Sequence, residues 1–411
     1  MRYCFATSVV VLLLAMSPAR AQNLAEDEYI RYDLQPPDTN SVSVTHDVSA
    51  VTPGAKTYSD PIPAGVQVSG VSVVDLMTGT PLTFKQMEGR IDVTLARPVP
   101  KGGQARIRIL ETFRDPARYH RDARAGNDVI FTWPLTVRRA AIVLPKGSEL
   151  VGANVPVQLV QESDLRLAVN FMNLYPVDVP LVIKARALKG TTVLPRPPEN
   201  NMVRGPERTP TPPADPAPAP QRMDQIRVTE RAVQDREIVY FLKQPETHAF
   251  SLYHDYTASH EGEHQYVNVV RTGSTVSDPS AVILDTGEVL KTRTLTGADI
   301  AREKIDISER VEPDTQVVLI PFTPVKKGTS IRLRISETYT DPARYALIEG
   351  QLMWHRSFGR NRNDMVLPDG WYPTTCSIPA VVTEERDGRI RLSFWNPRPD
   401  NVDVFVKGSR R

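Results

Sequence analysis

The stretch PVPKGGQARIRILETFRDPARY, residues 98–119, returns later in the chain as PVKKGTSIRLRISETYTDPARY, residues 324–345. Both stretches contain a segment in which apolar and charged residues alternate, the period of a β-strand with one buried face. Both then run into Asp-Pro, a common signal for a turn. A strand and its following corner that recur at such a distance indicate the duplication of a whole domain rather than an array of short repeats.

The correspondence extends outward from this stretch. Residues 30–82 align with 238–290 without a gap, and roughly a third of the positions are identical. Further on, VLPKG (143–147) answers VLPDG (366–370). We therefore predict two repeats, repeat 1 near residues 28–188 and repeat 2 near residues 236–410.

Short alternating segments make up most of both repeats. SVSVTHDVS, QARIRILETF and LRLAVNF are rich in Val, Ile and Leu, and clusters of Pro and Gly separate such segments. This pattern predicts an all-β chain with two tandem homologous antiparallel β-sandwich domains. The best helix candidate, ADIAREKIDISERV, lies in an insertion near residues 291–322 that only the second copy carries.

Residues 195–221 separate the two repeats and contain ten prolines. Proline fixes φ, lacks a donor and disfavours helix in the residue before it. We expect this Pro-rich linker to be an extended spacer.

The first 21 residues have the composition of a secretory signal peptide. Arg2 supplies the positive charge, a short apolar run follows from Ser8 to Met16, and Ala19-Arg20-Ala21 provides small residues at the cleavage site. The apolar run is too short for a transmembrane helix, and no second apolar span follows. We therefore expect a periplasmic or secreted protein with no membrane span in the mature chain.

The charge of the chain argues against one class of partner, and its cysteine content excludes an intramolecular disulfide. The net charge is +2 with 24% charged residues and no long basic stripe, which argues against a nucleic-acid partner. Removal of the signal peptide leaves Cys376 as the only cysteine, so no intramolecular disulfide can form. Its apolar surroundings in the sequence predict a buried, unreactive thiol.

One segment matches a metal-binding motif, the H-E-x-x-H formed by His260, Glu261 and His264. On a helix this spacing places two imidazoles on one side for zinc, with the Glu activating a water molecule. However, Gly262 weakens a helix, and the duplication aligns HEGEH with the Pro-Gly connection at residues 52–56. We interpret the segment as a polar turn and keep a zinc-dependent, peptidase-like hydrolase as the alternative.

Two further motifs occur in both repeats. The pair His46-Asp47 recurs as His254-Asp255, and we expect a structural role because neighbouring strand residues face opposite sides. In the E-T-x-x-D-P-A-R-Y corner, the Arg is predicted to pair with the Glu at its start. The Arg and Glu residues concerned are Arg118 with Glu111 and Arg344 with Glu337.

Residues found only in the second copy are more informative about function. They combine aromatic rings with guanidinium groups, which suit sugars, peptides or carboxylates. The ligand-binding candidates are His355, Arg356, Arg360, Arg362, Trp371 and Tyr372. We therefore favour a non-catalytic binding or structural protein of the cell envelope with no cofactor, whose partner is a protein, peptide or glycan.

Overall fold

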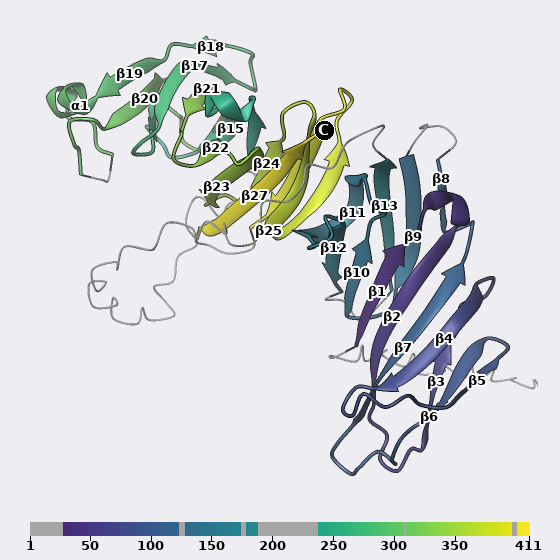
Figure 1. Cartoon of the computed structure of the whole chain (residues 1–411). Helices are drawn as coiled ribbons and strands as arrows, with labels where there is room; N and C mark the ends of the chain where they lie inside the picture. Colours follow the sequence, from purple (N-terminus) through teal and green to yellow (C-terminus); the bar gives the residue numbers. More distant parts are fainter. Residues whose placement is uncertain (1–27, 123–127, 174–177, 188–236, 308–309, 397–400) are drawn as a thin grey trace, which may run out of the picture.

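The computed structural model describes residues 28–122, 128–173, 178–187, 237–307, 310–396 and 401–411. Strands predominate throughout these segments, so the predicted all-β class is confirmed. The predicted signal peptide and Pro-rich linker lie outside the described residues. Figure 1 shows the residues of repeat 1 in purple to teal and those of repeat 2 in green to yellow.

Repeat 1 contains thirteen described strands and one short 3₁₀ helix, η1. Their bounds are β1 Tyr29–Leu34, η1 Pro37–Thr39, β2 Ser41–Ala50, β3 Thr57–Pro61, β4 Gln67–Asp75, β5 Phe84–Met87, β6 Arg90–Thr94, β7 Ala105–Arg114, β8 Tyr119–Arg121, β9 Asp128–Leu135, β10 Arg139–Val143, β11 Ser148–Gln161, β12 Leu167–Met172 and β13 Val179–Ala187.

Repeat 2 presents the same order of elements with an added short strand, β18, and an added helix, α1. The bounds are β14 Glu237–Leu242, η5 Pro245–Thr247, β15 Ala249–Ala258, β16 Gln265–Val269, β17 Thr275–Ile283, β18 Val289–Leu290, β19 Arg293–Thr296, α1 Gly297–Glu303, β20 Gln316–Pro321, β21 Ile331–Thr340, β22 Tyr345–Ile348, β23 Gln351–Phe358, β24 Arg362–Val366, β25 Trp371–Glu384, β26 Ile390–Trp395 and β27 Val402–Arg410. The helix predicted in the insertion is present but short.

Each repeat combines a long main sheet with a small three-stranded sheet. In repeat 1 the pairings run β4-β7-β2-β1-β10-β12-β11 and continue through β13, β9 and β8, while β3-β6-β5 form the small sheet. Repeat 2 repeats this arrangement, with β16-β20-β19 as its small sheet. The strand pairings are antiparallel, as predicted, except at two places, where β1 runs parallel to β10 and β14 runs parallel to β24.

The strands form where the sequence alternates. β2 shows an unbroken alternation of half-buried and buried residues, and it pairs with β7 along its full length, from Ser41 opposite Arg114 to Ala50 opposite Ala105. Val42 and Val44 contribute to the large core, whereas Val48 and Ala50 belong to a separate cluster under the small sheet. One strand therefore serves two cores.

The repeated D-P-A-R-Y corner closes on its own aspartate. Asp115 accepts hydrogen bonds from the backbone N–H groups of Ala117 and Arg118, and the Arg118 guanidinium lies 3.2 Å from its carboxylate. Arg344 lies equally close, at 3.2 Å, to the carboxylate of Asp341. The predicted pairing of these arginines with Glu111 and Glu337 is wrong, because the turn brings each Arg back over the aspartate three residues earlier.

The two repeats meet edge to edge through equivalent strands, β11 and β25 (Figure 1). Position n of β11 corresponds to position n + 223 of β25, as the two V-L-P-x-G motifs show. Val157 pairs with Ala380, the residue at the same position in repeat 2. The pairs Ala153↔Val382 and Leu159↔Cys376 are related by exchanging the two repeats, because Ala153 corresponds to Cys376 and Leu159 to Val382. The joint therefore has local two-fold symmetry, and one hydrophobic core continues across it.

Ion pairs and the lone cysteine complete this joint. Arg186 of repeat 1 binds Glu384 of repeat 2 at 2.5 Å, and Arg411 binds Glu149 at 2.5 Å. Cys376 is buried, and its thiol donates to the carbonyl of Ile378. Burial raises the pKa of this thiol to about 12, as expected for an unreactive cysteine.

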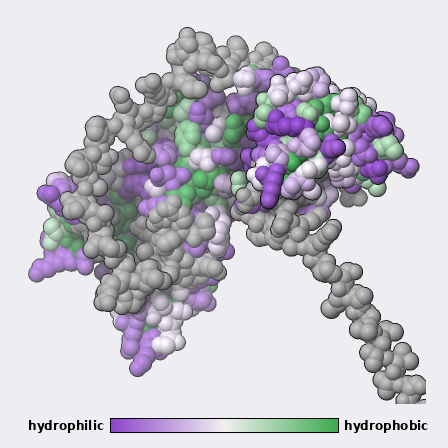
Figure 2. All heavy atoms as spheres, turned by 90° about the horizontal axis from the view of Figure 1, so that it is seen from below, coloured by the Kyte–Doolittle hydropathy of each residue, from purple (hydrophilic) through white to green (hydrophobic). Residues whose placement is uncertain are grey.

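Hydrophilic residues form most of the periphery on the face shown in Figure 2, and hydrophobic residues gather nearer its centre. Within the described segments, no helix has the length and apolar character needed to cross a bilayer.

Candidate ligand groove

Repeat 2 contains a groove of about 1460 Å³. Strands β14, β15, β21 and β23 supply one side, and β16 with the following loop supplies another. A further wall comes from Ile307, Arg310 and residues 312–316, which largely belong to the insertion that repeat 1 lacks. The extra segment predicted from the sequence thus builds part of the groove.

Arg356 lies at the bottom of this groove with only 8% of its surface exposed. Its guanidinium lies over the rings of Phe250, Tyr240 and Tyr339, at 5.0, 5.4 and 5.8 Å from their centroids. Aromatic faces stabilise a cation at such distances without neutralising its charge.

Trp133 of repeat 1 occupies the position equivalent to Arg356, because β9 and β23 correspond residue by residue in their strand pairings. Trp133 stacks on Phe113, with 4.9 Å between ring centroids, and the Arg118 guanidinium covers it at 4.5 Å. A neutral aromatic side chain therefore fills in repeat 1 the place where repeat 2 buries a charge.

Two arginines of the groove contact a single carboxylate, and a third arginine lies near it. Asp341 is fully buried and is held by the Ser274 hydroxyl at 2.9 Å, by Arg344 at 3.2 Å and by Arg356 at 3.6 Å. Arg271 lines the same groove, and burial together with the charges of Arg356 and Arg344 lowers its pKa. One carboxylate facing three guanidinium groups leaves excess positive charge at this end of the groove. Glu312 and Asp314 also line the groove, where Arg310 pairs with Glu312 at 2.9 Å.

Glu337 is a further carboxylate of this groove. Its side chain is buried and accepts hydrogen bonds from Asn268 at 2.7 Å and from the Tyr339 hydroxyl at 3.1 Å. Burial raises the pKa of Glu337, although these two hydrogen bonds act in the opposite direction. The rise in pKa favours the neutral form of Glu337 more than solution would.

His254 lies on β15 beside the same groove. Its Nδ1 is 3.1 Å from a guanidinium nitrogen of Arg360, whose other nitrogen donates to the carbonyl of Asp255. The rings of Tyr256 and Tyr266 pack together, with centroids 4.4 Å apart, next to the imidazole. Tyrosine faces and an arginine thus continue the surface away from Arg356.

The equivalent histidine of repeat 1 has an acidic environment. His46 contacts Glu28 at 2.9 Å and Asp60 at 3.3 Å. Burial opposes its protonation, but the hydrogen bonds to Asp60 and Glu28 prevail and raise its pKa to about 10. Nearby, burial and the charge of Asp60 raise the pKa of Glu111 to about 7. In repeat 2, Asn268 occupies the position of Asp60.

The six residues selected from the sequence do not all meet. Arg356 and Arg360 line the groove. His355 is exposed and faces Phe405, and Arg362 pairs with Glu237 at 3.1 Å. Trp371 is buried and donates to Gln244, and Tyr372 packs against the large core from β25.

Sequence reasoning missed Arg271, Asn268 and Tyr266, and for Arg344 it favoured a structural role over a repeated binding site. The replacements of Asp60 by Asn268 and of Trp133 by Arg356 were visible in the alignment of the repeats. The sequence does not show that these two positions belong to one site, because the small sheet and the main sheet come together only in the folded structure.

The HEGEH segment lies in the connection between β15 and β16, outside any helix. Gly262 has φ of 86°, His260 is 82% exposed, and Glu263 accepts a hydrogen bond from the Tyr256 hydroxyl. In the portion of the chain that the structure describes, no group of three or more His, Cys, Asp or Glu side chains could hold a metal ion. The two imidazoles of His260 and His264 thus lack the helical arrangement that the zinc hypothesis requires.

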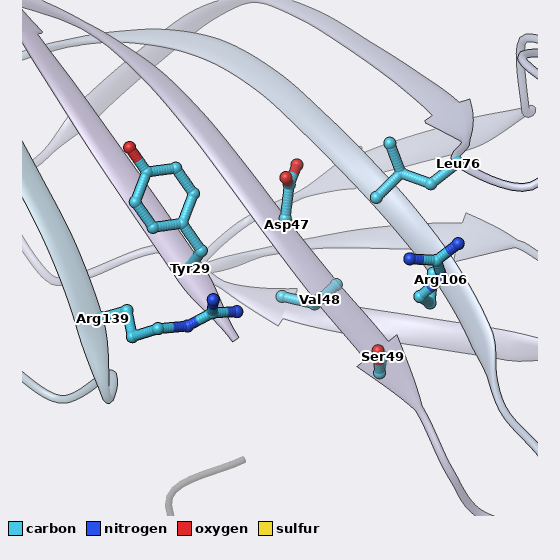
Figure 3. A pocket seen from close by; sticks show the side chains of 7 residues that line it. All are labelled: Tyr29, Asp47, Val48, Ser49, Leu76, Arg106 and Arg139. Atoms are coloured by element: carbon cyan, nitrogen blue, oxygen red, sulfur yellow. The ribbon is translucent and has the colours of Figure 1, made fainter. Parts of the chain in front are cut away.

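A second, smaller pocket of about 220 Å³ lies in repeat 1 (Figure 3). Asp47 and Tyr29 line it together with Arg106 and Arg139. The Asp47 carboxylate is already bound by Arg108 at 2.7 and 2.8 Å. This pocket is much smaller than the groove, and its acidic group is neutralised within the protein.

Comparisons with known proteins add little beyond this geometry. No family model matches the chain, and no curated protein matches it. Among solved structures, an M1 zinc metallopeptidase from Deinococcus radiodurans is 14% identical with a TM-score of 0.28, covering 39% of this chain and 41% of that one. The collagen adhesin of S. aureus is 6% identical with a TM-score of 0.19, covering 95% and 97%. The chain thus spans about two fifths of the metallopeptidase, and at these scores neither likeness carries an inference about function.

Proposed function

We propose that this chain is an exported, non-catalytic binding protein of the cell envelope, and that repeat 2 holds its protein, peptide or glycan partner in the groove. The signal peptide predicted at residues 1–21 supports export. Repeat 1, with Trp133 in place of Arg356, serves as the scaffold that supports repeat 2 through the joint of β11 and β25.

The observation that carries this proposal is the buried Arg356. A buried charge costs several kcal/mol to desolvate, and here its nearest carboxylate already has two other partners. The related repeat fills the same position with a tryptophan, so the fold does not need an arginine there. Binding of a partner at Arg356 would account for a buried charge that the fold itself does not require.

A pull-down from the exported fraction of the source cells, followed by direct binding of the identified partner, tests this proposal. Full-length protein should bind the purified partner, and Arg360→Ala should weaken binding because Arg360 lines the groove. Arg386→Ala is the matched control, since Arg386 is exposed on the turn between β25 and β26. Equal binding by both variants would locate the partner elsewhere and refute the proposal.

A further inference from the structure

The edge of β16 runs along the groove. β16 is the outer strand of the small sheet β16-β20-β19, and within the described residues no strand pairs with its other edge. Five consecutive residues, 266–270, line the groove. Because neighbouring side chains of a strand point to opposite faces, a continuous run of this kind means that the strand edge itself faces the groove.

The hydrogen-bond register shows which backbone groups this edge presents. Phe322 N–H donates to His264 C=O, and Val270 N–H donates to Gln316 C=O. Bonded pairs alternate in an antiparallel ladder, so positions 264, 266, 268 and 270 bond β20. The backbone groups of Gln265, Val267 and Val269 therefore point away from β20, and Val267 and Val269 line the groove.

The charged end of the groove follows this edge directly. β16 ends at Val269, and two residues later the chain reaches Arg271, which shares the groove with Arg344 and Arg356. A strand laid along β16 would thus bring one of its ends or side chains to the arginine cluster. The excess positive charge there complements a carboxylate, the usual partner of guanidinium groups.

We propose, on the basis of the function proposed above, that the groove binds an extended acidic peptide, which adds a strand to β16 and places a carboxylate among Arg271, Arg344 and Arg356. Backbone hydrogen bonds to an exposed strand edge supply affinity in this mode, and side-chain pockets supply selectivity. A glycan can supply the carboxylate but not the alternating N–H and C=O groups that match Gln265, Val267 and Val269.

The test uses the full mature chain and a library of random octapeptides with free C-termini. Binders should be enriched in Asp or Glu, or should require the free C-terminal carboxylate. Amidating the C-terminus and replacing acidic residues by their amides distinguish these two carboxylate sources. Arg271→Ala and Arg356→Met should each weaken the selected peptides by about tenfold or more, while Arg386→Ala leaves affinity unchanged.

Strand addition has its own readout. N-methylation at one alternate set of peptide residues should abolish binding, and methylation at the other set should be tolerated. Val267→Pro removes an N–H that faces the groove without removing a bond to β20, and proline is accepted on an edge strand. This variant should therefore keep its melting temperature and lose peptide affinity, whereas Val267→Thr should retain both.

Each outcome has a definite meaning. Neutral peptides that bind in the groove as well as acidic ones, or binding that is indifferent to N-methylation in both registers, would overturn this inference and leave the proposed function standing. Groove binding of polygalacturonate with no peptide binding would do the same. No binding of either probe by the wild-type chain would count against both proposals.

Discussion

The joint between the repeats should hold the two halves of the molecule together without the linker. Cleavage at a protease site engineered into residues 195–221 cuts the covalent connection but leaves β11 and β25 paired. The hydrophobic core is continuous across this joint, and Arg186–Glu384 and Arg411–Glu149 bridge it. We expect the cleaved halves to co-elute at about 1 μM protein.

A single substitution measures the contribution of the apolar part of this joint. Leu159 is fully buried and pairs with Cys376 across the joint. Truncating a buried leucine to alanine costs about 2–5 kcal/mol. If the whole loss affects the association of the two halves, the dissociation constant rises about 30-fold for 2 kcal/mol and a few thousand-fold for 5 kcal/mol. These factors are upper bounds, because part of the loss affects the folding of repeat 1 instead.

Leu181→Ala is the matched control. Leu181 is equally buried in the core of repeat 1, but it lies on β13 opposite Trp133 rather than at the joint. Both variants should lower the melting temperature by similar amounts, and only Leu159→Ala should separate the cleaved halves in sedimentation velocity. Separation of the cleaved wild-type halves at micromolar concentration, or equal effects of the two variants, would refute the symmetric joint as a stabilising interface.

Three further predictions concern the buried charges. The pKa of His46 in the folded protein is about 10, above its ordinary value of 6.5, so the stability that its protonation contributes is complete below pH 6.5 and disappears as the pH rises through 10. His46→Gln should lower the unfolding free energy by about 3 kcal/mol near pH 6. It should also flatten the decline in melting temperature between pH 6.5 and 10. Arg356→Met should raise the unfolding free energy by about 1–2 kcal/mol in urea titrations, because Asp341 keeps Arg344 and Ser274; a loss of stability would show that the arginine is structural. Asp115→Asn should lower the melting temperature by several degrees, since the Asp115 carboxylate anchors the corner through two backbone N–H groups and Arg118, and an unchanged value would contradict that role.

The strands could be predicted from the sequence because their signals are local. Alternation in SVSVTHDVSA and the Asp-Pro corner depend on residues close in the chain, and the duplication doubled the evidence for each. The parallel pairing of β1 with β10 could not be predicted in this way. It joins segments more than a hundred residues apart, and nothing in either segment specifies the direction of its partner.

The groove was only partly predictable for the same reason. Arg356 and Arg360 stood out because they belong to a segment specific to repeat 2. Arg344 belongs to a motif shared by both repeats, which favours a structural interpretation, although in repeat 2 it lines the groove. Arg271 carries no local signal, and its importance arises from the contact between two sheets.

The two repeats suggest how a binding site can arise without a new fold. The scaffold around the site is retained: the histidines of β2 and β15, the glutamates of β7 and β21 and the D-P-A-R-Y corners occupy equivalent positions. In repeat 1, Asp60 and Glu28 surround His46 and Trp133 fills the floor, so the charges are satisfied internally. In repeat 2, Asn268 removes one negative charge and Arg356 adds a positive one. These two substitutions, together with Arg271 in the place of Pro63, thus turn an internally neutralised cluster into a cationic one on a retained framework, and the insertion adds a wall to the groove that contains it.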